Sequence, residues 1–421
     1  MPAYPDTWYA RTLAETRDRP VLTGTVRGDC LVVGGGFAGL FAALGLARGG
    51  MRPVVIEAQA VGWGASGRNG GFVSAGFACG AAAIRARVGL VRAAELQALS
   101  AEGVGIMRAT IRDLAIPGAD PVPGILRMRR HEPGDDLRAE AEPGRRDYLD
   151  RAAIAAHLAS DRYRHGLLDH DAFHIHPLNT LRGIAAEVER LGGQIFEGSP
   201  AQAIALDGPV KEVRTPHGRA EAGQIVLATG GYTGPLVPRL RRAMLPIATY
   251  VMLSEAAPEL LATAIRTRAA VGDDRRAGDY YRLVAGGERL LWGGRITTRA
   301  ADLPGITRQL RREMLTVYPQ LAPLKTELAW SGLMAYARHL MPQIGALAPG
   351  AWHCTAFGGH GLNTTAIGGT VLAEAILGTS DRVEAFRPFG LDWAGGPAGL
   401  AAAQLTYWAL QARDLWRERR G

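Results

Sequence analysis

Residues 30–39 read Cys-Leu-Val-Val-Gly-Gly-Gly-Phe-Ala-Gly, a short apolar run followed by the glycine pattern G-x-G-x-x-G. Such a run is typical of a buried parallel strand, and the residues that follow, 40–48, read as a helix. Residues 54–57 form a second predicted strand that ends in an acid, Glu57, 18 residues after Gly39. This order of strand, glycine turn, helix, strand and acid predicts a dinucleotide-binding unit in an α/β fold.

The glycines of this motif have separate tasks. Gly34 permits the tight turn, Gly36 lets the backbone approach a diphosphate, and Gly39 lets the helix pack closely on the strand. The helix N-terminus offers N–H groups and a partial positive charge to the phosphates, and Glu57 accepts hydrogen bonds from a ribose diol. A purely structural glycine turn is the alternative interpretation. The predicted cofactor contacts here are Gly34, Gly36, Phe37, Ala38, Gly39, Glu57 and Ala58.

A polar, glycine-rich segment at 61–71 follows the second strand directly. A simple NAD domain would continue into another helix, whereas a long loop at this edge of the sheet suits a ligand that extends away from the adenosine. The segment therefore favours FAD over NAD, and a mobile surface loop is the alternative. The predicted cofactor contacts in it are Trp63, Gly64, Ala65, Ser66, Arg68, Asn69, Gly70 and Gly71.

Composition excludes several classes of protein. The chain has 421 residues, 47% of them hydrophobic and 21% charged, which is enough apolar side chain for a large core and excludes a disordered chain. The formal net charge is +8, but the basic residues are almost all scattered arginines, with only Lys211 and Lys325 as lysines. Because no DNA- or RNA-binding module accompanies this charge, we expect no nucleic-acid partner.

The location of the protein is predicted from its cysteines and its apolar segments. Three cysteines are too few and too far apart for a disulfide framework or a zinc site, so we expect no metal and a reducing cytoplasmic setting. No signal peptide is visible. The longest apolar run, 30–47, contains five glycines and is explained better by the strand, turn and helix than by a membrane span, so an integral membrane protein is not expected.

Further motifs lie along nearly the whole chain. They are Trp8-Tyr9, His176-Pro177-Leu178, Ile-Val-Leu-Ala-Thr-Gly-Gly-Tyr at 225–232, Arg-Leu-Leu-Trp-Gly-Gly-Arg at 289–295, Trp330-Ser331-Gly332, Pro-Gln-Ile-Gly at 342–345 and Phe-Gly-Gly-His-Gly at 357–361. With the glycine motif and the 61–71 segment, they make the chain resemble the FAD-dependent amine and amino-acid oxidoreductases of the D-amino-acid oxidase and glycine oxidase superfamily. The group that it resembles most is that of the gamma-glutamylputrescine oxidoreductases.

This resemblance implies a Rossmann-like FAD-binding domain built from separate segments and an α+β substrate domain with an antiparallel sheet. We expect the FAD-binding domain to comprise 1–84, 156–245 and 330–390, and the substrate domain to comprise 85–155 and 246–329. The remaining residues, 391–421, are expected to form an accessory helix docked on the FAD-binding domain, with an anionic membrane surface as the alternative contact. Its predicted apolar stripe is Leu400, Leu405, Trp408 and Leu415, and its basic end is Arg413, Arg417, Arg419 and Arg420.

The resemblance also adds cofactor contacts far along the chain. A predicted strand ends at Ala228, and a glycine turn at 358–361 begins a helix whose N-terminus would stabilise negative charge on a reduced flavin. The FAD is expected to be noncovalent, because the segment that carries the linking cysteine in covalent relatives has none here and Cys354 lies on a predicted strand. These further contacts are Ala228, Thr229, Gly230, Gly358, Gly359, His360, Gly361, Leu362 and Asn363.

The implied reaction is oxidation of a C–N bond in an amine or amino acid. Hydride passes to flavin N5, the imine hydrolyses to an aldehyde or oxo acid, and oxygen is the expected acceptor, giving hydrogen peroxide. A strong protein base is not needed, so the candidates are substrate-positioning residues: Tyr250, Tyr281, Arg338 and His360.

Two alternatives to this reaction stay open at the level of sequence. One is a D- or N-alkyl amino-acid dehydrogenase that passes electrons to a quinone. The other is a flavin-containing subunit of a larger complex, without turnover of its own. The sequence predicts no oligomeric state.

Overall fold

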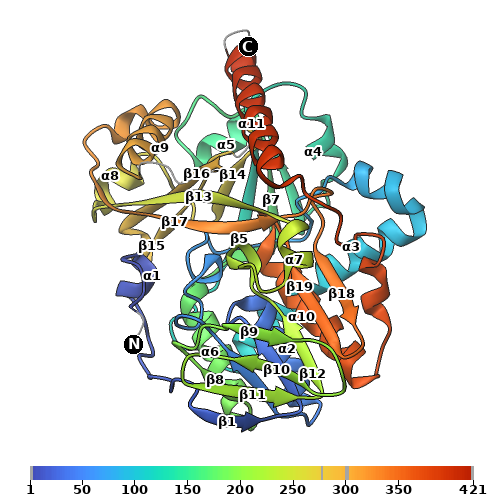
Figure 1. Ribbon diagram of the computed structural model, residues 1–421. Helices are drawn as coiled ribbons and strands as arrows, with labels where there is room; N and C mark the ends of the chain where they lie inside the picture. The colour runs from blue at the N-terminus through green and yellow to red at the C-terminus, as the bar shows by residue number, and fades with distance from the viewer. Residues whose placement is uncertain (1–2, 276–277, 299–302, 419–421) are drawn as a thin grey trace.

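The structure is a computed structural model that describes residues 3–275, 278–298 and 303–418. A six-stranded sheet lies in the lower half of the molecule, with the strand order β18-β19-β12-β2-β3-β8 (Figure 1). All of its neighbouring strands run parallel except β18, which is antiparallel to β19. The strands are β2 (Cys30–Val33), β3 (Pro53–Ile56), β8 (Gln194–Phe196), β12 (Gln224–Leu227), β18 (Gln343–Ala348) and β19 (Ala351–Thr355).

Helices with small residues pack closely beside this sheet. A Cβ built on Gly369 of α10 would lie 2.6 Å from the Cβ of Phe41 on α2, so these two helices touch almost backbone to backbone. A Cβ on Gly103 of α3 would likewise lie 2.2 Å from the carbonyl oxygen of Asn363. The helices of this layer are α2 (Phe37–Arg48), α3 (Ala81–Asp113), α6 (Pro177–Arg190) and α10 (Gly361–Leu377).

The position of α3 corrects the predicted domain boundaries. Residues 85–155 were expected in the substrate domain, but Leu96, Leu99 and Met107 of α3 are buried in the same core as α2 and α10. The helix joins that core because Gly103 allows it to approach α10. Only the later part of 85–155 joins the large sheet described below.

A small sheet covers the outer side of the six-stranded sheet. Its strands are β1 (Gly24–Arg27), β11 (Gly218–Ala222), β10 (Lys211–Arg214) and β9 (Ala203–Ala205), in that spatial order. Strand β1 pairs in parallel with β11, although the two are far apart in the chain. Val213 of β10 shares a buried cluster with Leu31 of β2 and Ile225 of β12, so the two sheets share a core.

A large, mainly antiparallel sheet forms the upper half of the molecule, with the order β17-β13-β16-β15-β14-β5-β7-β4 and β6 beside β7 (Figure 1). It includes β4 and β7, from segments expected in the FAD-binding domain, because β7 pairs along β5 and β4 pairs with β7. The strands are β4 (Phe72–Val73), β5 (Val122–Arg129), β6 (Arg146–Leu149), β7 (His165–His174), β13 (Leu245–Ser254), β14 (Ala270–Asp273), β15 (Tyr280–Val284), β16 (Arg289–Thr297) and β17 (Thr326–Tyr336).

Short helices cover the face of the large sheet that points away from the six-stranded sheet (Figure 1). Their apolar side chains and those of the sheet bury Trp292 and Tyr318 in a second core. The helices are α5 (Arg151–His157), α8 (Pro258–Ala262) and α9 (Leu303–Val317), and the other short helices of the chain are α1 (Trp8–Arg11), α4 (Asp135–Ala139) and α7 (Pro238–Arg242).

The last helix, α11 (Gly396–Glu418), rises from the large sheet at the top of Figure 1. It docks on this sheet rather than on the FAD-binding segments, because the N–H of Thr298 donates to Gln404 Oε1 at 3.0 Å. The predicted apolar stripe is not the docked face: Leu405 is 62% and Trp408 50% exposed.

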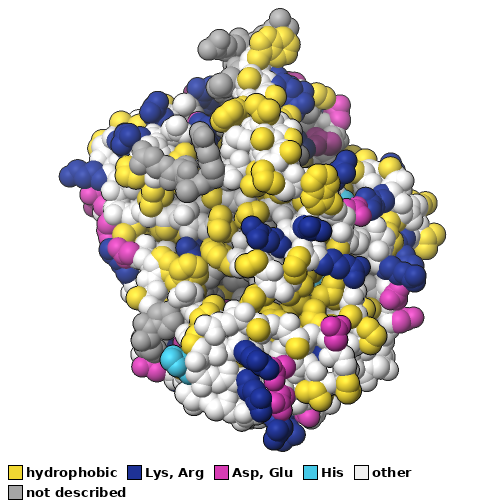
Figure 2. Space-filling model, in the orientation of Figure 1, with side chains coloured by type: hydrophobic (Ala, Val, Ile, Leu, Met, Phe, Trp, Pro, Cys, Tyr) yellow, Lys and Arg dark blue, Asp and Glu magenta, His cyan; other side chains and the backbone are white. Residues whose placement is uncertain are grey.

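Hydrophobic side chains therefore follow α11 on the surface shown in Figure 2. Arg419, Arg420 and the side chain of Leu415 lie outside the described part of the chain. No helix within the described ranges has both the length and the apolarity that crossing a bilayer requires.

Candidate functional site

A cavity of about 1760 Å³ lies between the six-stranded sheet and the large sheet. Ligand pockets commonly measure about 300–1,000 Å³, so this one has room for more than one small ligand. Its walls come from the turn after β2, the segment after β3, the turn after β12, the turn before α10, the cavity-facing side of the large sheet and α11.

The turn between β2 and α2 presents its backbone to the cavity. Gly34 has φ +112°, and a Cβ on it would lie 2.6 Å from the carbonyl oxygen of Ala228. A Cβ on Gly36 would lie 2.8 Å from Ser66 Oγ, which accepts a hydrogen bond from the N–H of Phe37 at 3.1 Å. Gly34 cannot carry a side chain without strain, a Cβ at Gly36 would displace the hydroxyl of Ser66, and the first turn of α2 faces the open space, as a diphosphate cradle requires.

Gly39 has the packing role that the sequence predicts. A Cβ there would meet the carbonyl oxygen of Gly34 at 2.0 Å, so the helix could not lie this close to the turn with any other residue. Gly39 itself is not among the residues that line the cavity.

Glu57 follows β3 and lines the cavity. Its Oε2 accepts the N–H of Gly35 at 2.6 Å, and its Oε1 accepts the N–H of Gln59 at 2.8 Å. Burial raises the pKa of Glu57, and the two N–H donors act in the opposite direction. The carboxylate is thus fixed beside the glycine turn, and each oxygen has a second lone pair for a ligand hydroxyl.

The segment after β3 is anchored rather than a mobile surface loop. The indole N–H of Trp330 donates to the backbone oxygen of Arg68 at 2.9 Å, and Arg68 Nη1 donates to the backbone oxygen of Ser331 at 3.0 Å. Tyr9 donates its hydroxyl hydrogen to the backbone oxygen of Asn69 at 2.7 Å. The residues of this segment that line the cavity are Gly62, Trp63, Gly64, Ala65, Ser66, Arg68, Asn69 and Gly70, whereas Gly71 does not.

The turn before α10 and the start of that helix line the cavity with all of their predicted contacts except Asn363. Gly358, Gly359, Gly361 and Leu362 line it, as do Ala58, Ala228, Thr229 and Gly230 elsewhere. Asn363 does not: its amide nitrogen donates to Ser100 Oγ at 2.9 Å, so the side chain points toward α3. The contact of Asn363 with the cofactor stays a prediction, and the direction of its side chain, into the core, does not support it.

His360 lines the cavity directly before α10. Its Nε2 lies 3.3 Å from Ser74 Oγ and 3.2 Å from the backbone oxygen of Ser74. Burial lowers the pKa of His360, which favours the neutral imidazole. The residue is therefore held in place and uncharged, as a positioning residue would be.

Two of the four substrate-positioning candidates face the core instead of the cavity. The hydroxyl of Tyr281 lies 2.7 Å from that of Tyr318, and its ring stacks on Trp292. The hydroxyl of Tyr250 lies 2.6 Å from Thr297 Oγ1, and the side chain belongs to the same core. These two predictions are corrected, because alternate residues of a strand point to opposite faces.

The neighbours of these tyrosines face the cavity in their place. Tyr280 and Thr249 line it, and the ring of Tyr280 lies against Gly70 and Phe72. The sequence contains the signal for this, since Tyr280 immediately precedes Tyr281. The fourth candidate, Arg338, lines the cavity with an exposed side chain.

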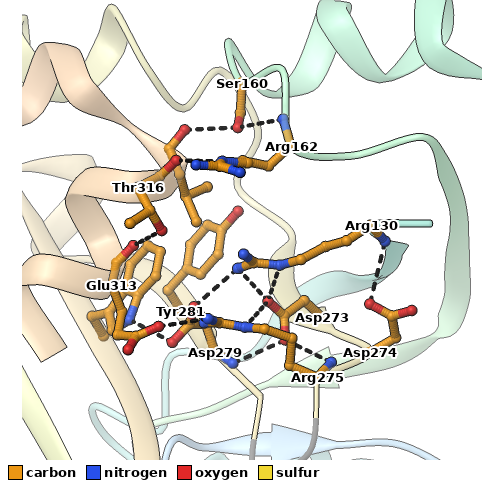
Figure 3. A network of polar contacts seen from close by, with 12 residues as sticks. Arg130, Ser160, Arg162, Asp273, Asp274, Arg275, Asp279, Tyr281, Glu313 and Thr316 are labelled. Carbon is orange, nitrogen blue, oxygen red and sulfur yellow. Dashed lines mark hydrogen bonds and ion pairs between the residues drawn. The ribbon is translucent and has the colours of Figure 1, made fainter. Parts of the chain in front are cut away.

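An ionic network behind the cavity was missed from the sequence (Figure 3). Arg275 and Arg295 both line the cavity and both pair with Glu313 of α9. Arg275 also pairs with the buried carboxylate of Asp279, which Arg130 contacts at 3.0 Å. Burial and the neighbouring carboxylate of Asp273 raise the pKa of Asp279 to about 7. Arg130, Arg295 and Glu313 are far apart in the chain, so no local sequence pattern shows that they meet the Asp273–Asp279 segment.

Comparison with known proteins gives consistent results. Residues 29–375 match the family model described as DAO, FAD dependent oxidoreductase. The chain is 33% identical over 395 residues to gamma-glutamylputrescine oxidoreductase of Escherichia coli K12, covering 92% of each chain. It is 32% identical over 380 residues to the probable oxidoreductase OrdL of Haemophilus influenzae, covering 87% of each.

Solved structures share the fold. Glycine oxidase from Geobacillus kaustophilus superposes with a TM-score of 0.72 at 19% identity, over 87% of this chain and 99% of that one. L-amino acid deaminase from Proteus vulgaris superposes with a TM-score of 0.70 at 19% identity, over 92% of this chain and 99% of that one. The predicted α/β fold class is confirmed.

Proposed function

Because the chain belongs to the DAO family of FAD-dependent oxidoreductases, we propose that it oxidises a carbon–nitrogen bond of an amine or amino acid. The observation that carries this proposal is the cavity, in which a diphosphate cradle and the cavity-facing side of the large sheet line one continuous space. The 33% identity to a relative named gamma-glutamylputrescine oxidoreductase supports an amine as the substrate.

The residues present fit FAD. The glycine turn would hold its diphosphate, Glu57 its adenosine ribose, and the segment 62–70 and the turn before α10 the remainder. When bound, the flavin accepts the two electrons and the hydrogen that leave the substrate. The N-terminus of α10 faces the cavity, where its partial positive charge favours negative charge.

The protein's own part in the reaction is to bind, orient and exclude water. Tyr280 and Thr249 form the wall of the large sheet, and the neutral His360 faces the cavity from the other layer. Among the described residues that line the cavity, Glu57 is the only carboxylate. The substrate amine must react in its neutral form, because the nitrogen lone pair forms the imine as the hydride leaves carbon. Its rate of oxidation should therefore rise with pH until the amine has lost its proton.

We propose oxygen as the electron acceptor, with hydrogen peroxide as the product. The test is anaerobic mixing of the yellow holoenzyme with a panel of amines and amino acids, followed by admission of air. Bleaching by an amine and one peroxide per substrate on reoxidation are expected. Bleaching without peroxide would favour the quinone-linked dehydrogenase, and absence of bleaching by every compound would favour a subunit without turnover.

We further propose that the FAD is noncovalent and that the protein works in the cytoplasm. Cys354 is the one cysteine among the described lining residues, and burial raises the pKa of its thiol, which disfavours the reactive thiolate. All three cysteines are free, which is consistent with a reducing compartment. Acid precipitation should release all of the yellow colour, and colour left in the pellet would show a covalent link. Fractionation of the source cells tests the location.

A further inference from the structure

We propose that α11 is a wall of the substrate end of the cavity and sets the length of amine that the enzyme accepts. This inference rests on the proposed amine oxidation. The substrate class that it names is an amine on an extended chain, whose unreactive part lies along α11.

One face of α11 lines the cavity, and most of its members are small. Gly399, Ala403, Thr406 and Leu410 recur at spacings of three and four residues, which places them on one side of a helix. The lining residues of α11 are Ala398, Gly399, Ala402, Ala403, Thr406, Tyr407 and Leu410. The first four carry at most a methyl group, so the wall leaves space beside it.

Two hydrogen bonds hold α11 against the large sheet near the middle of this face. A Cβ on Gly399 would lie 2.1 Å from the carbonyl oxygen of Ala394, so the chain turns tightly into the helix. Farther along, Gln404 accepts the N–H of Thr298 at 3.0 Å, and the hydroxyl of Tyr407 accepts the N–H of Ile296 at 3.4 Å. These contacts fix the rotation of α11, and with it the residues that face the cavity.

The surface facing α11 belongs to the large sheet. Ile296 and Arg295 of β16 and Ile247 of β13 line the same cavity. Ion pairs support this surface from the side of α9, because Glu313 pairs with Arg295 and with Arg275. Figure 3 shows Glu313 and Arg275 in this network. The alkyl chain of a substrate that lies between α11 and the large sheet would therefore contact a fixed surface on each side.

In the sequence, α11 lies outside the residues that match the family model. The match to the family model ends at residue 375, and α11 begins at Gly396. The diphosphate cradle and Glu57 lie in the matched part, so α11 adds a wall to a cavity whose cofactor end is common to the family. A wall of this kind changes which substrates fit without changing the chemistry.

The test fills the space beside α11 and leaves its outer face as the control. Ala403→Leu adds bulk on the cavity side, and Ala401→Leu adds the same bulk at an exposed position that does not line the cavity. Both holoenzymes are titrated with linear amines from propylamine to octylamine. Binding and reduction are both read by anaerobic rapid mixing, from the dependence of the rate of flavin bleaching on the concentration of each amine.

For Ala403→Leu we expect binding of the longest amines to weaken about tenfold or more while the shortest are unaffected, because overpacking costs about 1–3 kcal/mol. Ala401→Leu should keep the chain-length profile of the unaltered enzyme. Identical profiles in all three proteins would overturn the inference. If Ala403→Leu does not fold, Ala402→Leu at the adjacent lining position replaces it. If no linear amine bleaches the unaltered enzyme while an amino acid does, the inference fails and the proposed function stands. If no amine and no amino acid bleaches it, the proposed function fails.

Discussion

Single residues on the large sheet face the cavity or the core according to their position along a strand. On β15, Tyr280 lines the cavity and Tyr281 is buried against Trp292. On β13, Thr249 lines it and Tyr250 does not. The sequence did not show which face each residue takes, because the two faces of these strands are similarly apolar and aromatic.

Replacing Tyr280 and Tyr281 by phenylalanine, one at a time, should show which of the two faces the cavity and which faces the core. Tyr281→Phe removes a hydroxyl that lies within hydrogen-bonding distance of Tyr163 and Tyr318, so unfolding free energy should fall by about 1–3 kcal/mol with unchanged kcat/KM. Tyr280→Phe should change substrate affinity or kcat/KM with little loss of stability. Urea unfolding and steady-state kinetics on both variants check this, and the reverse pattern would contradict the assignment of faces.

Glu57 should govern retention of FAD. Glu57→Gln keeps the shape of the side chain but removes its charge, and a hydrogen bond to a charged group contributes about 1.5–3 kcal/mol. We expect FAD affinity to fall about tenfold or more, measured by flavin fluorescence during dialysis. Glu95→Gln, at an exposed site on α3, is the control. Equal retention of FAD in the two variants would contradict the assignment of Glu57 to the ribose.

The glycine motif at 34–39 could be predicted residue by residue, because each glycine answers a local backbone requirement. Asn363 could not, because the direction of its side chain is set by α3, which is distant in the chain. The ion pairs of Arg275 and Arg295 with Glu313 were missed for the same reason, since Glu313 is distant from both arginines in the chain.

At the level of elements, the close packing of α2, α3 and α10 depends on glycines, which have no side chain. Gly103 and Gly105 of α3 provide a matched test. A Cβ on Gly103 would lie 2.2 Å from the carbonyl oxygen of Asn363, whereas Gly105 has nothing within 4 Å. The place of α3 beside α10 follows from this close packing.

Alanine at the two glycines should therefore act in opposite directions. Gly103→Ala should lower the free energy of unfolding by about 1–3 kcal/mol, because the helices must move apart. Gly105→Ala should raise it by up to about 1 kcal/mol, because alanine favours a helix more than glycine does. Thermal and urea unfolding of the two variants check the signs. A stabilised Gly103→Ala protein would contradict the packing of α3 on α10.

For the whole molecule, stability should depend on pH through Asp279. Its pKa is raised to about 7 in the folded state, above the usual value near 4 of an unfolded aspartate, so the folded state binds more protons between these values. The free energy of unfolding should then fall as pH rises from about 4 to 7, by at most about 1.4 kcal/mol per pH unit.

Replacing Asp279 tests this dependence. Asp279→Asn should flatten the pH profile of the urea midpoint between pH 4.5 and 7.5. Asp135→Asn, at an exposed site, should leave it unchanged. A profile that keeps its slope in Asp279→Asn would assign the effect to another group.

The strand pairing of the six-stranded sheet has a consequence for synthesis on the ribosome. Val32 of β2 pairs with Val226 of β12, and Val226 pairs in turn with Trp352 of β19. At about 5–20 residues per second, β12 leaves the ribosome roughly 6–25 s before β19 does. During that interval one edge of β12 has no partner strand and the turn before α10 does not exist. Flavin can therefore meet a complete site only after nearly all of the chain has been translated.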